Sequence, residues 1–254
     1  MKLAIDLPPI PFRITGARVA VLGYGPNAGH HARGLRDAGN EVSIGLRAGG
    51  MSWSRARHDG FRVAPPCSVV PDAHVVVALV PDEEQASVYW HAIAPSISPQ
   101  ALLVFGRALA LETRAFEPVG VDVVFVAGND PRCRVAVHHD AGGRALERAI
   151  AYARAAFGGA VAIATTTIAA EAEAELAALE RRAGGVAGFR AQLDRAMAHA
   201  RDSHAPDEAR ISYYEGLSAL VNDRARRAEP RADGRGDGAP VVSLAERRSA
   251  RGPS

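Results

Sequence analysis

The first residues whose types and spacing suggest chemistry are the glycines that follow a short apolar run at residues 19–22. Gly23 and Gly25, with the small Ala28 three residues later, have the spacing of a dinucleotide-binding turn. Gly23 permits a tight turn, Gly25 lets the backbone approach a pyrophosphate, and Ala28 lets the next helix pack closely on the strand. The phosphates would meet the free N–H groups of a helix N-terminus. Such turns also occur for purely steric reasons, so the rest of the chain must decide.

A second candidate for nucleotide chemistry is Arg47, which follows the predicted second strand. The residue at this position contacts the adenosine ribose: an acid accepts from the 2′-hydroxyl, whereas an arginine accommodates a 2′-phosphate. Ser52 and Ser54 lie a few residues beyond, and no acid lies close to Arg47 in the sequence. We therefore predict NADP(H) rather than NAD(H). The alternative interpretation is a solvated surface loop.

The elements that would position these residues follow from hydrophobic patterning. Short apolar runs alternate with segments of helical periodicity, which predicts a Rossmann-like α/β fold with a doubly wound parallel sheet. The predicted strands are 18–22, 41–46, 74–80, 101–105, 121–127 and 135–139, and the helices between and after them are 27–38, 54–59, 81–89 and 143–157. Beyond residue 165 the pattern is helical only, over 168–183, 189–203 and 207–227. We predict a small all-helical domain there.

Composition sets the organisation of the chain and excludes some functions. The 254 residues are 48% apolar and 23% charged, with a net charge of +2. We divide them into an N-terminal arm (1–16), a dinucleotide-binding domain (17–164), a helical domain (165–228) and a disordered tail (229–254). The arginines are spread out, so we expect no nucleic-acid partner, and no apolar run has the length of a membrane span. Two cysteines without metal-ligand spacing suit a reducing cytoplasm.

Several separated stretches resemble one family, the ketol-acid reductoisomerases, which are NADP- and magnesium-dependent enzymes of branched-chain amino-acid synthesis. The similarity covers about residues 15–227 and is strongest up to about residue 90. The matching stretches are Gly23-Tyr-Gly25 with His31-Ala32, Leu35-Arg-Asp-Ala-Gly39, Gly45-Leu-Arg47 with Ser52-Trp53, Asp59-Gly-Phe61, Pro81-Asp-Glu83 with Gln85-Ala86 and Val88-Tyr89, and, weakly, Tyr213-Tyr-Glu215.

The resemblance implies where the cofactor binds. Its dinucleotide-binding positions correspond here to Gly23, Tyr24, Gly25, Pro26, Asn27, Arg47, Ser52, Asp82, Glu83, Glu84 and Gln85. Two positions depart from the family: Pro26 replaces a small hydroxyl residue, and Gly50 replaces a serine that often binds phosphate. The loss of one hydroxyl contact should weaken NADP binding by roughly 1–3 kcal/mol without abolishing it.

The catalytic half departs further from the family. Arg107 stands where the family has a histidine, and Gly128-Asn129-Asp130 replaces a Pro-Lys-Gly segment that contains a catalytic lysine. Of the expected carboxylates for two magnesium ions, Glu175 and Glu215 remain, but their i+4 companions are Leu179 and Ala219. Since magnesium requires oxygen ligands, we expect no two-magnesium centre. Arg107 is then the best candidate to stabilise a developing alkoxide, and Glu175 and Glu215 complete the predicted catalytic set; the alternative is that Arg107 is structural.

Other clusters are interpreted as structural. Glu171, Glu173 and Glu175 are spaced two apart, which spreads them around a helix and favours a solvated face. The adjacent pairs His30-His31 and His138-His139 point apart, so we expect no shared metal.

These observations give three hypotheses. The first is a reductoisomerase-like oxidoreductase that reduces a small carbonyl or imine substrate, of keto-acid type, with NADP(H) and without the isomerisation. The second is a nucleotide-binding pseudoenzyme or regulatory module, and the third is a true ketol-acid reductoisomerase. The helical segments after residue 165 have apolar faces with no further sheet to cover, so we also expect a homodimer through that region, to which Glu215 could contribute across the interface.

Overall fold

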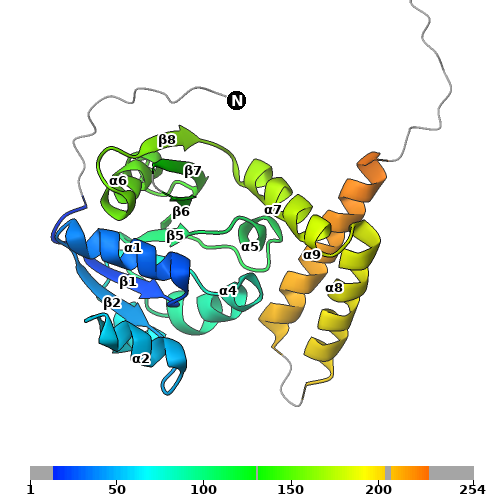
Figure 1. Cartoon of the computed structure of the whole chain (residues 1–254), viewed down its shortest axis with the longest axis horizontal. Coiled ribbons are helices and arrows are strands. Elements are labelled where there is room, and N and C mark those ends of the chain that lie inside the picture. Colours follow the sequence, from blue (N-terminus) through cyan, green and yellow to red (C-terminus); the bar gives the residue numbers. More distant parts are fainter. Residues whose placement is uncertain (1–13, 130, 204–206, 229–254) are drawn as a thin grey trace, which may run out of the picture.

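The computed structural model describes residues 14–129, 131–203 and 207–228. Its centre is an eight-stranded sheet in the order β3-β2-β1-β4-β5-β6-β7-β8 (Figure 1). The strands are β1 (Arg18–Leu22), β2 (Glu41–Gly45), β3 (Arg62–Ala64), β4 (Val75–Ala78), β5 (Leu102–Phe105), β6 (Asp122–Asn129), β7 (Arg132–His139) and β8 (Ala162–Thr165). The order reverses between β1 and β4, which places the topological switch point beside the glycine turn. The predicted Rossmann-like sheet followed by helices is confirmed.

Two strands depart from the predicted parallel arrangement. β7 runs antiparallel to β6, and β8, which is parallel to β7, runs in the same reversed direction. Only residues 130 and 131 separate β6 from β7, and a parallel pair needs a crossover of a dozen or more residues. A second difference is β3, a three-residue edge strand that hydrophobic patterning missed because it has no buried residue.

The sheet separates two cores, one on each face. Along β4, Val75 and Val77 belong to the core under α1 (Pro26–Asp37) and α6 (Ala145–Phe157). Val76 and Ala78 point to the opposite core, which is covered by α3 (Pro66–Val69), α4 (Asp82–Val88), the π-helical turn η1 (Tyr89–Ile93) and α5 (Leu109–Glu112). Helices on both faces of a buried parallel sheet explain the continuous apolar runs of its central strands. Helix α2 (Met51–His58) lies beside β3.

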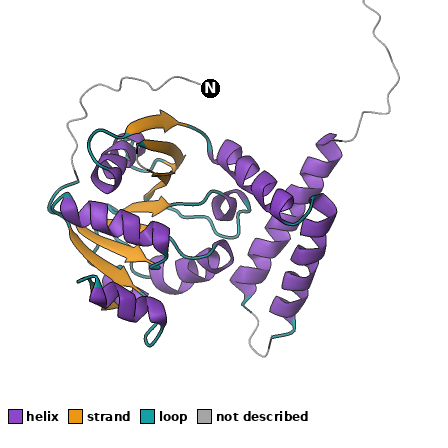
Figure 2. Cartoon of the chain, in the orientation of Figure 1, coloured by secondary structure: helices purple, strands orange, loops and turns teal. Residues whose placement is uncertain are grey.

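Three further helices, α7 (Ile168–Arg182), α8 (Val186–Arg201) and α9 (Glu208–Ala228), follow the sheet and group at one side of it (Figures 1 and 2). Their apolar faces are covered within the chain, because Leu176 of α7 and Tyr213 and Leu217 of α9 join the core that contains α4 and α5. The approach of α9 is close: a Cβ atom on Gly216 would lie 2.4 Å from the carbonyl oxygen of Thr113. These faces therefore do not need a partner subunit to cover them, and the homodimer stays a prediction.

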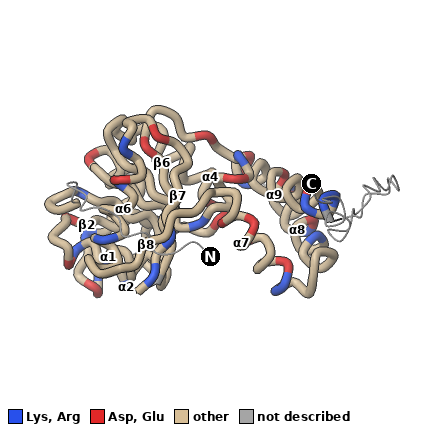
Figure 3. The backbone as a smooth tube through the Cα atoms, turned by 90° about the horizontal axis from the view of Figure 1, so that it is seen from above, with Lys and Arg blue, Asp and Glu red and all other residues tan. Residues whose placement is uncertain are grey.

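Over the described residues, Arg is interspersed with Asp and Glu along the backbone (Figure 3). Within the described ranges, no helix combines the length and the hydropathy that crossing a bilayer requires. Of the predicted arm (1–16), residues 1–13 lie outside the described residues. The predicted tail (229–254) lies outside them entirely.

Candidate dinucleotide and reaction site

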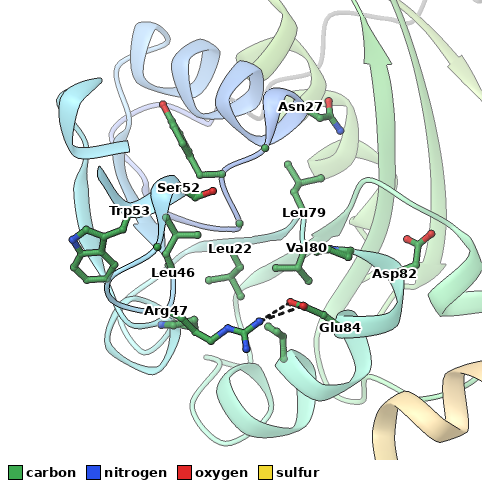
Figure 4. Close-up of a pocket in the computed structure, with 18 of the residues that line it drawn as sticks. Leu22, Asn27, Leu46, Arg47, Ser52, Trp53, Leu79, Val80, Asp82 and Glu84 are labelled. Carbon is green, nitrogen blue, oxygen red and sulfur yellow. Dashed lines mark hydrogen bonds and ion pairs between the residues drawn. The ribbon is translucent and has the colours of Figure 1, made fainter. Parts of the chain in front are cut away.

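A cavity of about 850 Å³ opens at the carboxyl ends of β1, β2 and β4 (Figure 4). Its walls come from the glycine turn, the loop after β2, the start of α2, the start of α4 and Arg107. All of the predicted cofactor residues except Pro26 and Gln85 line it. The structure thus brings together residues that lie more than 60 positions apart in the sequence.

The glycine turn has the geometry that its sequence predicts. Gly23 has φ +96°, and a Cβ atom on it would lie 2.6 Å from the carbonyl oxygen of Leu79. Gly25 is different, because a Cβ atom there would meet nothing within 4 Å. Gly23 is therefore required by the fold, whereas Gly25 keeps the backbone open toward the cavity.

Helix α1 begins at this turn with unpaired amides. Gly25 is its N-cap and Pro26 its first residue, a position where the missing N–H of proline costs no helical hydrogen bond. The first intrahelical bond runs from the Gly29 N–H to the Gly25 carbonyl (2.9 Å). The amides of Asn27 and Ala28 come before it, and the first turn contains no acidic residue. This N-terminus can receive an anionic phosphate.

The ring of Tyr24 belongs to the core beside the glycine turn. The side chain is buried against Phe61, with 5.8 Å between ring centroids, and its hydroxyl donates to Asp59 Oδ2 (2.5 Å). Burial, together with the Asp59 carboxylate, raises the pKa of Tyr24 to about 12. The Arg55 guanidinium donates to the Tyr24 carbonyl oxygen (2.5 Å). Tyr24 and Arg55 therefore fix the turn from behind.

The adenosine end of the cavity holds an arginine that is already paired. Arg47 is 85% exposed, and its Nη2 lies 3.2 Å from both carboxylate oxygens of Glu84 (Figure 4). Ser52 lies in the first turn of α2, where the Trp53 N–H donates to the Gly50 carbonyl (3.0 Å) and the amides of Met51 and Ser52 come before that bond. A second helix N-terminus and a guanidinium thus face the same space. Glu84 was predicted as a cofactor residue, but its contact with Arg47 was not, because the two residues lie 37 positions apart in the sequence.

The first turn of α4 divides into residues that face the cavity and residues that support it. Asp82, Glu83 and Glu84 line the cavity. Gln85 is buried, and its amide donates to Asp82 Oδ1 (3.1 Å) and to the Val80 carbonyl (3.3 Å). In this chain Gln85 holds Asp82 in place.

Arg107 is the centre of a charged cluster beside the cofactor cavity. Its Nη2 donates to Asp82 Oδ2 (2.8 Å), and its Nε lies 3.5 Å from Glu175 Oε2. Glu175 also accepts from the backbone N–H groups of Ala108 (3.0 Å) and Leu109 (3.2 Å). Burial raises the pKa of Asp82 and of Glu175, and the charge of Arg107 opposes the shift in both. The structure thus brings Arg107, Glu175 and Asp82 into one cluster, and the catalytic roles of Arg107 and Glu175 stay predictions.

Two further residues near this cluster were not predicted from the sequence. Tyr213 of α9 is buried, and burial raises its pKa, as do the negative charges of Asp82 and Glu83. Glu171 is also buried, and its Oε1 accepts from Arg134 Nε (2.7 Å). The expectation that Glu171 and Glu175 lie on a solvated face was wrong, because residues i and i+4 share a helix face and this face of α7 packs toward β7.

Glu215 is not part of this cluster within one chain. Its carboxylate pairs with Arg201 of α8 (2.7 Å) and is 55% exposed. It lines neither the cofactor cavity nor the smaller cavity beside Arg107. A contribution of Glu215 across a subunit interface stays a prediction.

The side chains at the cluster do not fit a two-magnesium centre. Asp82 and Glu175 both contact the Arg107 guanidinium, and the i+4 companion of Glu175 is Leu179. Over the residues that the structure describes, no three acidic, histidine or cysteine side chains converge on a common point. A hard cation would need several oxygen ligands here, and the guanidinium occupies the position between the two carboxylates that are present.

The fold and the cavity define a dinucleotide-binding Rossmann protein. Residues 13–162 match the family model for acetohydroxy acid isomeroreductase, NADPH-binding domain. The chain belongs to this family, which confirms the resemblance to ketol-acid reductoisomerases, and its matched half is built for a nicotinamide cofactor.

Solved structures agree with this assignment. An NADH-preferring ketol-acid reductoisomerase from an uncultured archaeon is 25% identical, with a TM-score of 0.60 over 84% of this chain and 70% of that chain. A semialdehyde dehydrogenase NAD-binding protein from Cupriavidus necator, determined with calcium and NAD, is 15% identical (TM-score 0.55, 85% and 86% coverage). The 3-hydroxyisobutyrate dehydrogenase of Mycobacterium tuberculosis is 18% identical (TM-score 0.51, 89% and 76%). The last two show the shared fold alone.

Proposed function

We propose that this protein is an NADP(H)-dependent oxidoreductase that reduces a small carbonyl or imine substrate of keto-acid type, without the two-magnesium isomerisation. The observation that carries the proposal is the position of Arg107. Its side chain lines the cofactor cavity and also a second, smaller cavity bounded by β6, β7 and α7. A substrate in the second cavity would touch a fixed cation at the edge of the cofactor site.

The cofactor half supports NADP(H) as the dinucleotide. Two helix N-termini with unpaired amides face the cavity, at α1 for the pyrophosphate and at α2 for a 2′-phosphate. Arg47 and Ser52 lie at the α2 end, and the apolar side chains of Leu79 and Val80 supply a surface for a ring. When bound, the reduced nicotinamide would supply a hydride.

The residues around Arg107 then support the reduction itself. Hydride addition to a carbonyl carbon leaves negative charge on the oxygen, and a guanidinium held in place by Asp82 and Glu175 can stabilise that charge without reorganising. The oxygen must also take up a proton. In this proposal the proton comes from solvent by way of Asp82 or Glu175, which pair with Arg107 as carboxylates and whose pKa values are raised by burial.

The proposal omits the isomerisation because of the donor set around Arg107. An alkyl shift on a ketol needs a Lewis acid to polarise the substrate. The carboxylates in this site neutralise a guanidinium, and the position one turn after Glu175 is Leu179. Reduction with a single fixed cation does not require those ligands.

The test uses the purified full chain with NADPH, a panel of 2-oxo acids and cyclic imines, and 2-acetolactate. We expect NADPH oxidation with at least one member of the panel, unchanged by EDTA, and at least a 100-fold loss of kcat in Arg107→Met with the Kd for NADPH within threefold of wild type. Arg62→Met, an exposed arginine on β3, is the matched control. Magnesium-dependent turnover of 2-acetolactate would favour the third hypothesis, a true reductoisomerase.

One observation favours a nucleotide-binding module as the second candidate. Arg107 is paired with two carboxylates in the structure, which reduces its positive charge toward a substrate. In a module of this kind the cofactor half would bind NADPH as proposed, and no substrate of the panel would be reduced. Tight binding without turnover is the outcome that would replace the enzyme proposal by this one, and binding of neither nucleotide would contradict both.

A further inference from the structure

The smaller cavity beside Arg107 has a volume of about 200 Å³ and an unusual concentration of arginine. Arg107 comes from the loop after β5, Arg134 from β7 and Arg182 from the end of α7. Two carboxylates, Glu171 and Glu175, line it as well. The remaining lining is apolar and small: Phe125, Ala127, Ala174, Ala178 and Leu179.

The two carboxylates are already engaged by the protein. Glu175 accepts from two backbone N–H groups and contacts Arg107, and Glu171 accepts from Arg134 Nε. Arg134 uses only this edge of its guanidinium in the contact and is 55% exposed. Its Nη groups are therefore available to a ligand.

Arg182 is the third guanidinium group of this cavity. Glu171, Glu175 and Arg182 follow one another at intervals of four and seven residues, so they lie on the same face of α7. Among the residues that the structure describes, the Arg182 side chain has no ion pair or hydrogen-bond partner. Arg107 and Arg134 already contact carboxylates, so Arg182 brings an unpaired guanidinium to the cavity, next to an apolar wall.

We propose that this cavity binds the carboxylate of the substrate through Arg134 and Arg182, and holds a short aliphatic chain against Phe125 and Leu179. This inference rests on the proposed function and assigns its substrate-recognition residues. A guanidinium binds a planar carboxylate with parallel N–H donors. With the carboxylate at Arg134 and Arg182, the carbonyl or imine carbon of a 2-oxo acid or its imine would point to Arg107 and the cofactor cavity. Small carboxylates are then bound without a metal ion.

The experiment measures binding without requiring turnover. Isothermal titration of the full chain, saturated with NADP⁺, uses 2-oxobutanoate as the probe. The control compound is butan-2-one, which has a methyl group in place of the carboxylate. We expect 2-oxobutanoate to bind and butan-2-one not to bind. Arg182→Ala should weaken 2-oxobutanoate at least tenfold, and Arg181→Ala, its exposed neighbour on the same helix, should change the Kd less than twofold.

Arg134 needs a paired variant, because its removal leaves Glu171 buried without a partner. Arg134→Met is therefore combined with Glu171→Gln, and a thermal melt establishes that the variant folds. We expect at least a tenfold loss of 2-oxobutanoate binding in this double variant. Equal losses in Arg181→Ala and Arg182→Ala, or no binding to wild type, would overturn the assignment.

The outcomes separate this inference from the proposed function. If NADPH is oxidised with a 2-oxo acid but Arg182→Ala and the Arg134 double variant keep the wild-type KM, the inference is wrong and the function stands. If 2-oxobutanoate binds as described but no substrate is reduced, the cavity is assigned correctly and the reductase function is wrong.

Discussion

The cofactor cavity has a dinucleotide side and a reaction side, and the two are lined by different kinds of group. On the dinucleotide side, the groups that face the cavity are the glycine turn and the first amides of α1 and α2. On the reaction side, they are the charged side chains of Arg107 and Asp82, and Glu175, Arg134 and Glu171 lie around the smaller cavity beyond Arg107. Backbone amides bind phosphate whatever side chains the helix has, whereas a charged cluster depends on every one of its members.

This difference explains how the chain resembles its family unevenly. Substitutions at Pro26 and Gly50 leave the amides of α1 and α2 in place, so the dinucleotide side tolerates them. On the reaction side, Arg107 stands at the position where the resemblance places a histidine, and its charge contacts two carboxylates, so a change at this position affects both partners.

The largest expected effect tests the backbone origin of the dinucleotide side. Gly23→Ala places a Cβ atom 2.6 Å from the Leu79 carbonyl oxygen at a positive φ, and we expect a loss of about 2–4 kcal/mol in the free energy of unfolding. Gly25→Ala meets no atom within 4 Å, so its stability should change by less than about 1 kcal/mol. Its methyl group should nevertheless weaken NADPH at least tenfold by occupying the approach to the pyrophosphate.

Urea denaturation and NADPH titration of both variants give the comparison directly. The expected result is one variant that loses stability and one that loses binding alone. If Gly25→Ala binds NADPH as well as wild type, the pyrophosphate does not lie against this turn, and the assignment of the dinucleotide side fails.

The difference between the two sides also separates the features that could be predicted from the sequence from those that could not. The glycine turn, α1 and Arg47 were predictable because they are local: a strand, a turn and a helix within 30 residues. The contact between Arg107 and Glu175 joins segments 68 residues apart, and the family resemblance placed both residues in one catalytic set without predicting their contact. Glu84 beside Arg47, Glu171 beneath Arg134 and Tyr213 near Asp82 depend on how α4, α7 and α9 pack. Periodicity gives a helix its buried face, but not the partner of each charge on that face.

A second prediction compares His31, which is buried between α1 and α6, with the carboxyl groups of the reaction side, because their pH dependences are opposite. Burial lowers the pKa of His31 on α1 to about 4, with a further contribution from His30. His31 therefore contributes fully to stability above its ordinary pKa of 6.5, and about 3 kcal/mol is lost as the pH falls from 6.5 to 4. Asp82 and Glu175 have raised pKa values. Their contribution is present below their ordinary values of 3.8 and 4.5 and is lost as the pH rises through the raised ones.

His31→Gln tests the contribution of His31 to this pH dependence. His31 is buried and hydrogen-bonded to the Tyr152 hydroxyl (2.6 Å), and glutamine can keep a polar contact there without titrating. Unfolding free energies from urea melts between pH 7.5 and pH 4.5 should fall with acid in wild type and in the control His30→Gln, an exposed neighbour. In His31→Gln the decline should disappear. A decline of the same size in all three proteins would show that another group causes it.

The smallest expected effect concerns the ion pair at the adenosine end of the cavity. Glu84 holds Arg47 at 3.2 Å, so a 2′-phosphate must compete with a carboxylate for the same guanidinium. Because Arg47 is largely exposed, we expect the competition to cost only about 0.5–1 kcal/mol. Glu84→Gln should therefore improve the Kd for NADPH about three- to fivefold and leave NADH within twofold.

Arg47→Ala gives the reciprocal result, a loss of NADPH affinity with little change for NADH. The double variant Arg47→Ala/Glu84→Gln decides whether the two residues act through one contact, because the benefit of Glu84→Gln should vanish once Arg47 is absent. If Glu84→Gln improves NADPH equally in both backgrounds, Glu84 repels the phosphate directly. If it improves NADH instead, the carboxylate does not face the ribose, and nucleotide preference is set elsewhere in the loop after β2.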